Sequence, residues 1–373
     1  MSLGIYIHAP WCTLRCPYCA FTVYVDRNPP FDQWTERILQ NWQWNSKQIK
    51  SDQYLISSIY FGGGTPSLVP IPLLEKIISE LPKDPNTEIT IEMNPEDVTE
   101  EILKHYHEIG INRLSIGIQT FHPKHAKLLR RSHTVQQAHD ILQIIKEGPI
   151  KNWSFDLIFG LPKQSVEDLY YDLNYIKQLQ PPHISLYGLS YEEGTPLTRA
   201  VEQQKIIPLE EDIWKQQFDG IVQTLKDLGY RRYEVSNFSK LGFESRHNEN
   251  TWKGASYIGL GPSAHGYLPN KNRTLYDSNF QKWLQQEEPY IEESSQDQLM
   301  MDLILTRLRH ADGIPIHELP LLGYSINISA LQQYMEHDML EYSSSNRLKL
   351  GPKGWNVVDS LILKVIEATD KNI

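Results

Sequence analysis

Three cysteines lie within eight residues of one another near the start of the chain, at Cys12, Cys16 and Cys19. They are the only cysteines among 373 residues, and an odd number cannot form a complete set of internal disulfides. Their Cys-x3-Cys-x2-Cys spacing places three thiolates on one short loop, where they can bind a single inorganic centre. A four-iron cluster normally takes four thiolates, so three would leave one iron open to another ligand. The spacing therefore favours a [4Fe–4S] cluster with an open iron.

Two other interpretations of the cysteines stay open at this point. One is a structural zinc ion with His8 as the fourth ligand, although zinc knuckles usually add a second, distant cysteine pair and this chain has none. The other is a chance cluster of ordinary buried thiols. All the cysteines of the chain stand together, which makes chance clustering hard to sustain.

Further residues that could bind a ligand or take part in a reaction stand at or near the ends of short apolar segments. They are the run Gly62-Gly63-Gly64-Thr65, then Glu92, Gln119 and Asp156. Glycines let the backbone approach a ligand and present its N–H groups. A carboxylate within an apolar strand, such as Asp156, needs a partner. Because parallel strands bring their carboxyl ends together, we expect these residues to share one site with the cysteine loop.

The elements that would position these residues alternate along the first 240 residues. Six apolar segments are expected as strands: Gly4–His8, Ile56–Phe61, Glu88–Met93, Arg113–Gln119, Ser154–Phe159 and His183–Tyr187. Helical periodicity marks five segments between them: Phe31–Ile49, Pro72–Leu81, Glu100–Ile109, Val135–Lys146 and Val166–Leu179. Six βα units predict an α/β fold with a parallel sheet. Polar residues at the ends of several strands favour a TIM-like barrel over an open sheet, which would gather ligand contacts at one switch point.

The chain beyond the six βα units has a different pattern. We expect a helix over Glu210–Leu228, a strand over Arg232–Val235, and irregular structure over residues 237–272, which are rich in Gly, Ser and Asn. The predicted division is a core barrel over residues 1–240, a connecting segment near the barrel mouth over 241–295, and a C-terminal domain over 296–373.

The C-terminal domain resembles a small α+β winged-helix unit. Its expected elements are helices at Asp297–Arg309, Ile328–His337 and Trp355–Ile366 and a hairpin at Leu340–Leu350. Residues 296–373 hold seven Lys/Arg against ten Asp/Glu, and the whole chain has a formal net charge of −10. Phosphate neutralisation needs a basic face, so we expect a packing or partner-binding role and no nucleic acid.

The order of motifs resembles the radical SAM superfamily and, more narrowly, the coproporphyrinogen III oxidase-like family. The motifs are the cysteine loop with the preceding residues 6–11, and residues 59–67, 113–121, 156–162 and 259–265. The resemblance implies a partial (β/α)6 barrel with a C-terminal domain, a [4Fe–4S] cluster held by the three cysteines, and S-adenosylmethionine (SAM) bound at the open iron. It implies SAM contacts at Tyr6, Tyr18, Gly63, Gly64, Thr65, Glu92, Gln119, Arg131 and Asp156.

In three features the chain resembles the HemW-type haem chaperones of this family more than its oxidases. The oxidases carry a further cysteine two residues after the third, where this chain has Phe21, and they have a longer segment before the residue that matches Tyr6. The chaperones have a His-Asn-x-x-Tyr-Trp motif, which reads His247-Asn248-Glu249-Asn250-Thr251-Trp252 here, with Thr251 in place of tyrosine. His247 is then an expected axial haem ligand, with a hydrogen-bonded structural histidine as the alternative.

The resemblance implies a protein that binds haem and passes it to an unknown acceptor protein, which could be membrane-bound. The alternatives are an oxygen-independent coproporphyrinogen III oxidase, or another radical SAM enzyme acting on a tetrapyrrole, and a zinc-stabilised interaction protein. No secretory signal or membrane-spanning run is evident, so we expect a soluble cytoplasmic protein. A peripheral contact with the membrane and a homodimer stay open, as does cleavage of SAM.

Overall fold

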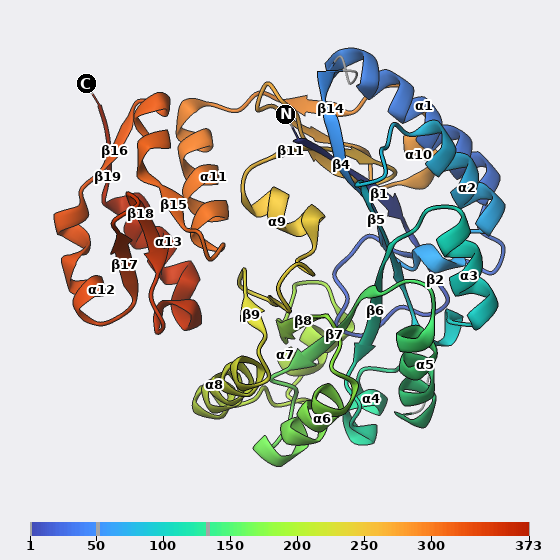
Figure 1. The fold of residues 1–373 in the computed structure, drawn as a ribbon, viewed down its shortest axis with the longest axis horizontal. Helices are drawn as coiled ribbons and strands as arrows, with labels where there is room; N and C mark the ends of the chain where they lie inside the picture. The colour runs from blue at the N-terminus through green and yellow to red at the C-terminus, as the bar shows by residue number, and fades with distance from the viewer. Residues whose placement is uncertain (1, 50–52, 132–134, 373) are drawn as a thin grey trace.

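The computed structural model describes residues 2–49, 53–131 and 135–372. Six neighbouring parallel strands form the centre of its main sheet: β1 (Ser2–Ala9), β4 (Leu55–Gly63), β5 (Glu88–Met93), β6 (Arg113–Gln119), β7 (Asn152–Phe159) and β8 (His183–Gly188). The sheet curves without closing on itself, so it is a partial barrel (Figure 1). The prediction of a partial TIM-like α/β barrel followed by a C-terminal domain is confirmed.

Amphipathic helices cover the outer face of this sheet (Figure 1). They are α1 (Phe31–Ile49), α2 (Ile71–Glu80), α3 (Glu100–Glu108), α5 (Val135–Glu147), α6 (Val166–Leu179) and α8 (Glu211–Asp227). In α1 the buried Trp34, Ile38 and Trp42 recur every four residues, which places them on one face against the strands. The strands read as continuous apolar runs because both of their faces are covered.

Shorter elements connect or extend these units. Four short helices are α4 (Pro123–Leu128), α7 (Pro196–Glu202), α9 (Arg246–Trp252) and α10 (Phe280–Gln285). A two-strand pair, β2 (Trp11–Cys12) and β3 (Tyr24–Val25), brackets the cysteine loop. At one edge of the main sheet lie β10 (Asn237–Ser239) and β9 (Arg231–Arg232).

The prediction of irregular structure over residues 237–272 was wrong. Residues 241–295 contain α9 and a run of strands: β11 (Ser256–Leu260), β12 (His265–Tyr267), β13 (Arg273–Leu275) and β14 (Tyr290–Glu292). Strand β11 pairs in parallel with β1, so these strands extend the main sheet. The glycines reflect tight packing, because a Cβ atom at Gly259 would lie 2.0 Å from the His265 carbonyl oxygen.

Helix α9 lies at the amino ends of the barrel strands, opposite the mouth. The backbone N–H of His247 donates to Glu88, the first residue of β5 (3.3 Å), and Asn250 donates to Ser57 near the start of β4 (3.1 Å). The mouth of a parallel barrel lies at the carboxyl ends of its strands. This segment therefore plugs the bottom of the barrel.

The prediction of a strand over Arg232–Val235 was also wrong, except at its first residue. Strand β9 ends at Arg232, and the Val235 N–H donates to the Arg309 carbonyl (3.1 Å). Glu234 forms an isolated bridge with His310. The backbone here leaves the sheet because its hydrogen bonds are made with the C-terminal residues.

The C-terminal residues form a unit beside the barrel, at the left of Figure 1. Its elements are α11 (Gln296–Leu308), β15 (Ile314–Pro315), β16 (Tyr324–Ile326), α12 (Gln332–Glu336), β17 (Leu340–Ser343), β18 (Arg347–Leu350), α13 (Val358–Glu367) and β19 (Thr369–Lys371). Its apolar side chains form a buried cluster of their own. The expected helices at 328–337 and 355–366 each begin instead with a 3-10 turn, at Ile328–Leu331 and Gly354–Val357. Within the described residues, none of the helices has the length and apolar character needed to cross a bilayer.

Candidate functional site

A cavity of about 500 Å³ opens at the carboxyl ends of the barrel strands. Eleven of the predicted site residues line it: Cys12, Cys16, Tyr18, Cys19, Gly63, Gly64, Thr65, Glu92, Gln119, Arg131 and Asp156. They come from the loops or ends of five strands, which a parallel barrel brings to one rim. Two predicted site residues, Tyr6 and His247, are not among the lining residues.

The cysteine loop is tied to the strand ends around it. The Thr65 hydroxyl donates to the sulfur of Cys12 (3.4 Å), and the Arg131 guanidinium contacts the sulfur of Cys16 (Nη1–Sγ, 3.6 Å). The Cys19 N–H donates to the Cys16 carbonyl (3.2 Å), which closes a tight turn between these two cysteines. Burial raises the pKa of the Cys12 thiol to about 11, partly offset by the Thr65 hydrogen bond.

The spread of the three sulfurs bears on the zinc alternative. Only one group of three metal-ligating atoms lies within 4.8 Å of one another in the described part of the chain, and the cysteines are not in it. Thiolates on one zinc ion stand about 3.8 Å apart, given Zn–S bonds of about 2.3 Å. His8 is also engaged, because its ring nitrogens hydrogen-bond to Tyr6 (3.1 Å) and to the Thr22 carbonyl (3.0 Å). The arrangement suits a centre larger than one ion.

The glycine run packs tightly against the protein itself. Gly63 has a φ of +114°, and a Cβ atom there would lie 2.6 Å from the His8 ring. A Cβ atom at Gly64 would lie 2.6 Å from the Trp11 carbonyl oxygen, just before the first cysteine. Glycine is therefore needed to seat the end of β4 against the cysteine loop, in addition to any role beside a ligand.

Two carboxyl groups line the cavity from β5 and β7, the strands on either side of β6. Glu92 accepts hydrogen bonds from the Tyr60 hydroxyl (2.8 Å) and the Gly63 N–H (3.1 Å). Burial raises the pKa of Glu92 to about 7, against the lowering effect of the Tyr60 hydrogen bond. Burial likewise raises the pKa of Asp156 to about 6. Both groups would be stabilised by a cationic ligand, which would favour their ionised forms.

Arg131 reaches back into the cavity from beyond the end of α4. Its Nη2 donates to Asn94 Oδ1 (2.9 Å), so the guanidinium lies between β5 and the cysteine loop. Gln119 ends β6 with a φ of +71°, a left-handed conformation that is uncommon outside glycine. A guanidinium and an amide at this rim can bind a carboxylate and hydroxyl groups.

Tyr6 and His247 lie deeper in the barrel, below the cavity. The Tyr6 ring stacks on Tyr60, with ring centroids 6.1 Å apart, and Tyr60 in turn donates to Glu92. The His247 side chain is only 8% exposed and its Nδ1 hydrogen-bonds to Ser58 (3.0 Å). Burial lowers the pKa of His247 to about 4, so the imidazole is neutral. The structure does not bring His247 to the cavity.

Several lining residues were missed in the sequence. Asn94 lies just after β5, Ser115 lies within β6, and Tyr187 and Ser190 lie at the end of β8. Asn94 also donates to Thr65 (3.4 Å), which links two of the predicted residues. The rule that polar side chains at strand ends form the site would have found Asn94, Tyr187 and Ser190. Nothing in the sequence singled out Ser115.

Comparisons with known proteins agree on one relationship. A family model described as the radical SAM superfamily matches residues 6–176. The chain is 36% identical to "Heme chaperone HemW" of Buchnera aphidicola subsp. Schizaphis graminum over 291 residues, 76% of each chain. It is 30% identical to the protein of the same name from Synechocystis over 371 residues, which covers 94% of this chain and 89% of the relative.

The fold has a solved counterpart over nearly its whole length. The structure of coproporphyrinogen III oxidase (HemN) from Escherichia coli, described as a radical SAM enzyme, aligns with a TM-score of 0.80. The alignment covers 97% of this chain and 89% of that chain at 17% sequence identity. At that identity the likeness concerns the fold alone.

Proposed function

This chain belongs to the radical SAM superfamily and, within it, to the family of proteins named heme chaperone HemW, and on that premise we propose that it binds haem and transfers it to an acceptor protein. We include in the proposal a [4Fe–4S] cluster on Cys12, Cys16 and Cys19 and a SAM molecule beside it. The observation that carries the cofactor assignment is the shared cavity, which is lined by all three thiols and by two buried carboxyl groups.

The cavity has the chemistry that SAM requires. SAM carries a permanent sulfonium charge, which suits the buried carboxyl groups of Glu92 and Asp156. Its carboxylate suits the guanidinium of Arg131, and its ribose hydroxyls suit the amide of Gln119. Tyr18, Gly63, Gly64 and Thr65 complete the predicted contacts along the same wall. When bound, the cluster supplies an open iron and a reducing electron for SAM.

The position two residues after Cys19 argues for the chaperone role over the oxidase role. Phe21 stands there, 65% exposed at the lining of the cavity, and offers no thiol. We therefore expect no decarboxylation of coproporphyrinogen by the reconstituted protein under anaerobic reducing conditions. Turnover of that substrate would contradict the chaperone proposal and favour the oxidase alternative.

Anaerobic reconstitution tests the cofactor part separately. The full chain should take up about four irons and four sulfides, since one cluster fills the site. Cys16→Ser should lose the cluster, whereas Arg27→Ala, an exposed change just after β3, should retain it. Zinc without iron in the anaerobically purified chain would favour the zinc alternative instead.

Haem titration tests the cargo part. The reconstituted chain should bind haem and release it to an acceptor apoprotein, followed by the absorbance of the haem. If Cys16→Ser still binds haem, the cargo site is independent of the cluster. Absence of haem binding by the intact, cluster-loaded chain would sink the chaperone proposal. The acceptor, a homodimer and a peripheral contact with the membrane stay predictions.

A further inference from the structure

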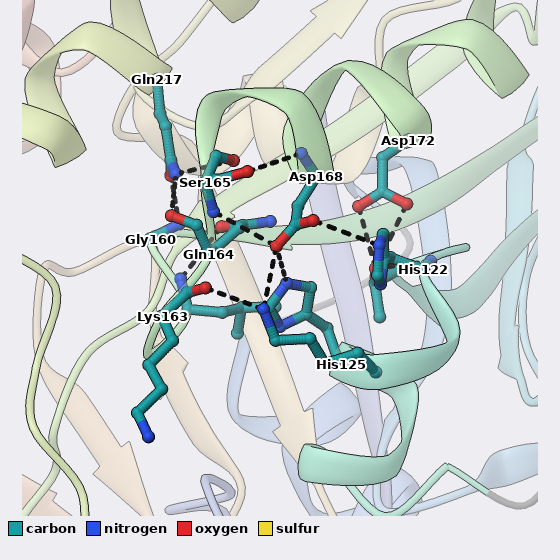
Figure 2. A network of polar contacts seen from close by, with 12 residues as sticks. His122, His125, Gly160, Lys163, Gln164, Ser165, Asp168, Asp172 and Gln217 are labelled. Carbon is teal, nitrogen blue, oxygen red and sulfur yellow. Dashed lines mark hydrogen bonds and ion pairs between the residues drawn. The ribbon is translucent and has the colours of Figure 1, made fainter.

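Three side chains of metal-ligating type meet on the loops beside α4 and α6, outside the lining of the cysteine cavity. His122 immediately precedes α4 and His125 lies in its first turn. Asp168 lies in the first turn of α6. Figure 2 shows both imidazoles pointing toward the carboxylate of Asp168. Their ligand atoms all lie within 4.8 Å of one another.

The distances match the coordination shell of a small metal ion. His122 Nε2 lies 3.2 Å from one carboxylate oxygen of Asp168, and His125 Nε2 lies 2.9 Å from the other. Ligands on one tetrahedral zinc ion, with bonds of about 2.05 Å, stand about 3.3 Å apart. A metal ion could therefore take the place of a proton between each imidazole and the carboxylate with little change in these two distances.

The burial pattern provides both rigidity and access. The side chain of His125 is 1% exposed, whereas those of His122 and Asp168 are 21% and 18% exposed. Each imidazole also has a buried Nδ1 atom without a hydrogen-bond partner. One side of the group therefore faces solvent, from which an ion and a completing water can enter.

We propose that His122, His125 and Asp168 form a second metal site, for a divalent late first-row ion, with zinc the best match to two imidazoles and one carboxylate. The ion would join the start of α4 to the start of α6. It would thereby brace the segment between Gln119 and Arg131, whose two ends face the SAM cavity. This proposal does not depend on the haem chaperone role.

Lys124 is the main competitor for the carboxylate. Its ammonium lies 3.2 Å from Asp168, and its side chain is 54% exposed. In the alternative without a metal ion, the lysine and the two imidazoles are only hydrogen-bonding partners of a helix-capping carboxylate. The two cases differ in what happens when the lysine is removed. A competing cation would be lost, so a real metal site would bind its ion more tightly.

Zinc binding by the cluster-loaded full chain is the test, because the loaded cluster keeps the cysteines from taking zinc. Calorimetric titration with zinc should show one ion per chain. His122→Ala should weaken that binding by at least about tenfold, because it removes one of the three proposed ligands. Lys124→Ala should tighten it several-fold. Zinc should also raise the thermal midpoint of the parent chain and of Lys124→Ala.

His139→Ala is the matched control. His139 pairs with Asp140 at 3.6 Å on α5, is partly exposed, and has no third ligand within the described residues. Its loss should leave zinc binding unchanged. The proposal is overturned if the parent chain binds no zinc, or if His122→Ala binds zinc as tightly as the parent. A gain of affinity in Lys124→Ala cannot come from misfolding, so it separates the site from a damaged protein.

Discussion

The carboxyl group of Glu92 connects the chemistry of the cavity to the interior of the barrel. It faces the cavity, but its hydrogen-bond donors are the backbone at Gly63 and the hydroxyl of Tyr60, which is stacked on Tyr6. Tyr6 can therefore influence a bound ligand through Tyr60 and Glu92 without lining the cavity. The contact with SAM that the family resemblance implies for Tyr6 would then be indirect.

We predict that SAM binding strengthens as the pH rises from about 6 to about 8. The pKa of Glu92 is raised to about 7, so this range converts a neutral acid into the carboxylate that attracts the sulfonium ion. Glu92→Gln should remove the part of this dependence above about pH 7, where Asp156, with a pKa raised to about 6, is already mostly ionised. The same change should weaken SAM binding at pH 8 by about 10-fold or more, the value of a charged hydrogen bond. Anaerobic calorimetry on the reconstituted chain measures both. A pH profile shared by parent and variant would assign the effect to another group.

We predict that His247→Ala affects stability more than haem binding. The side chain is buried, hydrogen-bonded to Ser58, and packed 5.1 Å from the Tyr60 ring. Its loss should lower the free energy of unfolding by about 2 kcal/mol. Haem affinity should change less than about twofold, because haem would have to displace α9 to reach this nitrogen. Two results in a folded variant would support His247 as an axial ligand. One is loss of haem binding, and the other is a shifted absorbance spectrum of haem that still binds.

Helix α6 fixes the loop that follows β6. Asp172 accepts hydrogen bonds from the Phe121 N–H (2.6 Å) and the Thr120 hydroxyl (2.9 Å), directly after Gln119. The start of the same helix holds Asp168, which is bound by the histidines of α4 (Figure 2). One helix on the outside of the barrel thus positions a loop whose other side faces the cavity.

Asp172→Ala should therefore destabilise the chain and weaken SAM binding together. The buried Phe121 N–H would lose its acceptor, at a cost of about 1–3 kcal/mol. Burial raises the pKa of Asp172 to about 7, so its contribution is greatest at acid pH and is lost as the pH rises through 7. Urea unfolding at pH 6 is the measurement. The exposed Asp140→Ala is the control, and equal effects of the two would contradict the role of α6.

The sequence predicted the long elements well and the short ones poorly. The six central strands are continuous apolar runs and α1 is strongly amphipathic, so both have a clear periodicity. Helices α4, α7 and α9 have six or seven residues, too few for a periodic pattern. The strand β11 was missed because its Gly259 signalled a loop, when in fact it permits a close strand crossing. Pairing between distant segments, such as β11 with β1, leaves no local signal.

Most of the cavity was predictable for a similar reason. Cys12, Glu92 and Gln119 stand at strand ends, and parallel strands bring such ends together whatever lies between them. The distance of His247 from the cavity was not predictable, because a motif gives a residue type and an order but not the end of the barrel where a short helix packs. Its role as a haem ligand stays a prediction. The pair His122 and His125 lacked meaning until α6 supplied Asp168.

At the scale of the whole molecule, Arg232 joins the barrel to the C-terminal unit. Its guanidinium lies over the rings of Phe218 (4.9 Å) and Phe238 (5.4 Å) in the barrel and over Trp355 (4.5 Å) in the C-terminal unit. Burial lowers the pKa of Arg232 to about 10, which leaves it charged at neutral pH. A single side chain therefore contacts aromatic rings of both parts.

Arg232→Ala should loosen the C-terminal unit while leaving the cysteine cavity intact. The lost cation–π contacts are worth about 1–2 kcal/mol where the cation is desolvated. Hydrogen exchange should speed up in residues 354–367, and iron uptake should stay unchanged. The neighbouring Arg231→Ala, which is exposed, is the control. Unchanged exchange in Arg232→Ala would show that other contacts, such as Lys253 with Asp312, hold the two parts together.

The position of α9 at the base of the barrel has a consequence for the entry and release of ligands. Because α9 closes the base, a ligand in the cavity would enter and leave away from that end, at the carboxyl ends of the strands. The exposed apolar side chains of Leu14 and Phe21 line the outer part of the cavity, and the buried carboxyl groups of Glu92 and Asp156 line its inner part. A large flat molecule that rested on Leu14 and Phe21 would cover any smaller ligand bound beneath it. In that case the smaller ligand would have to bind before the larger molecule and leave after it.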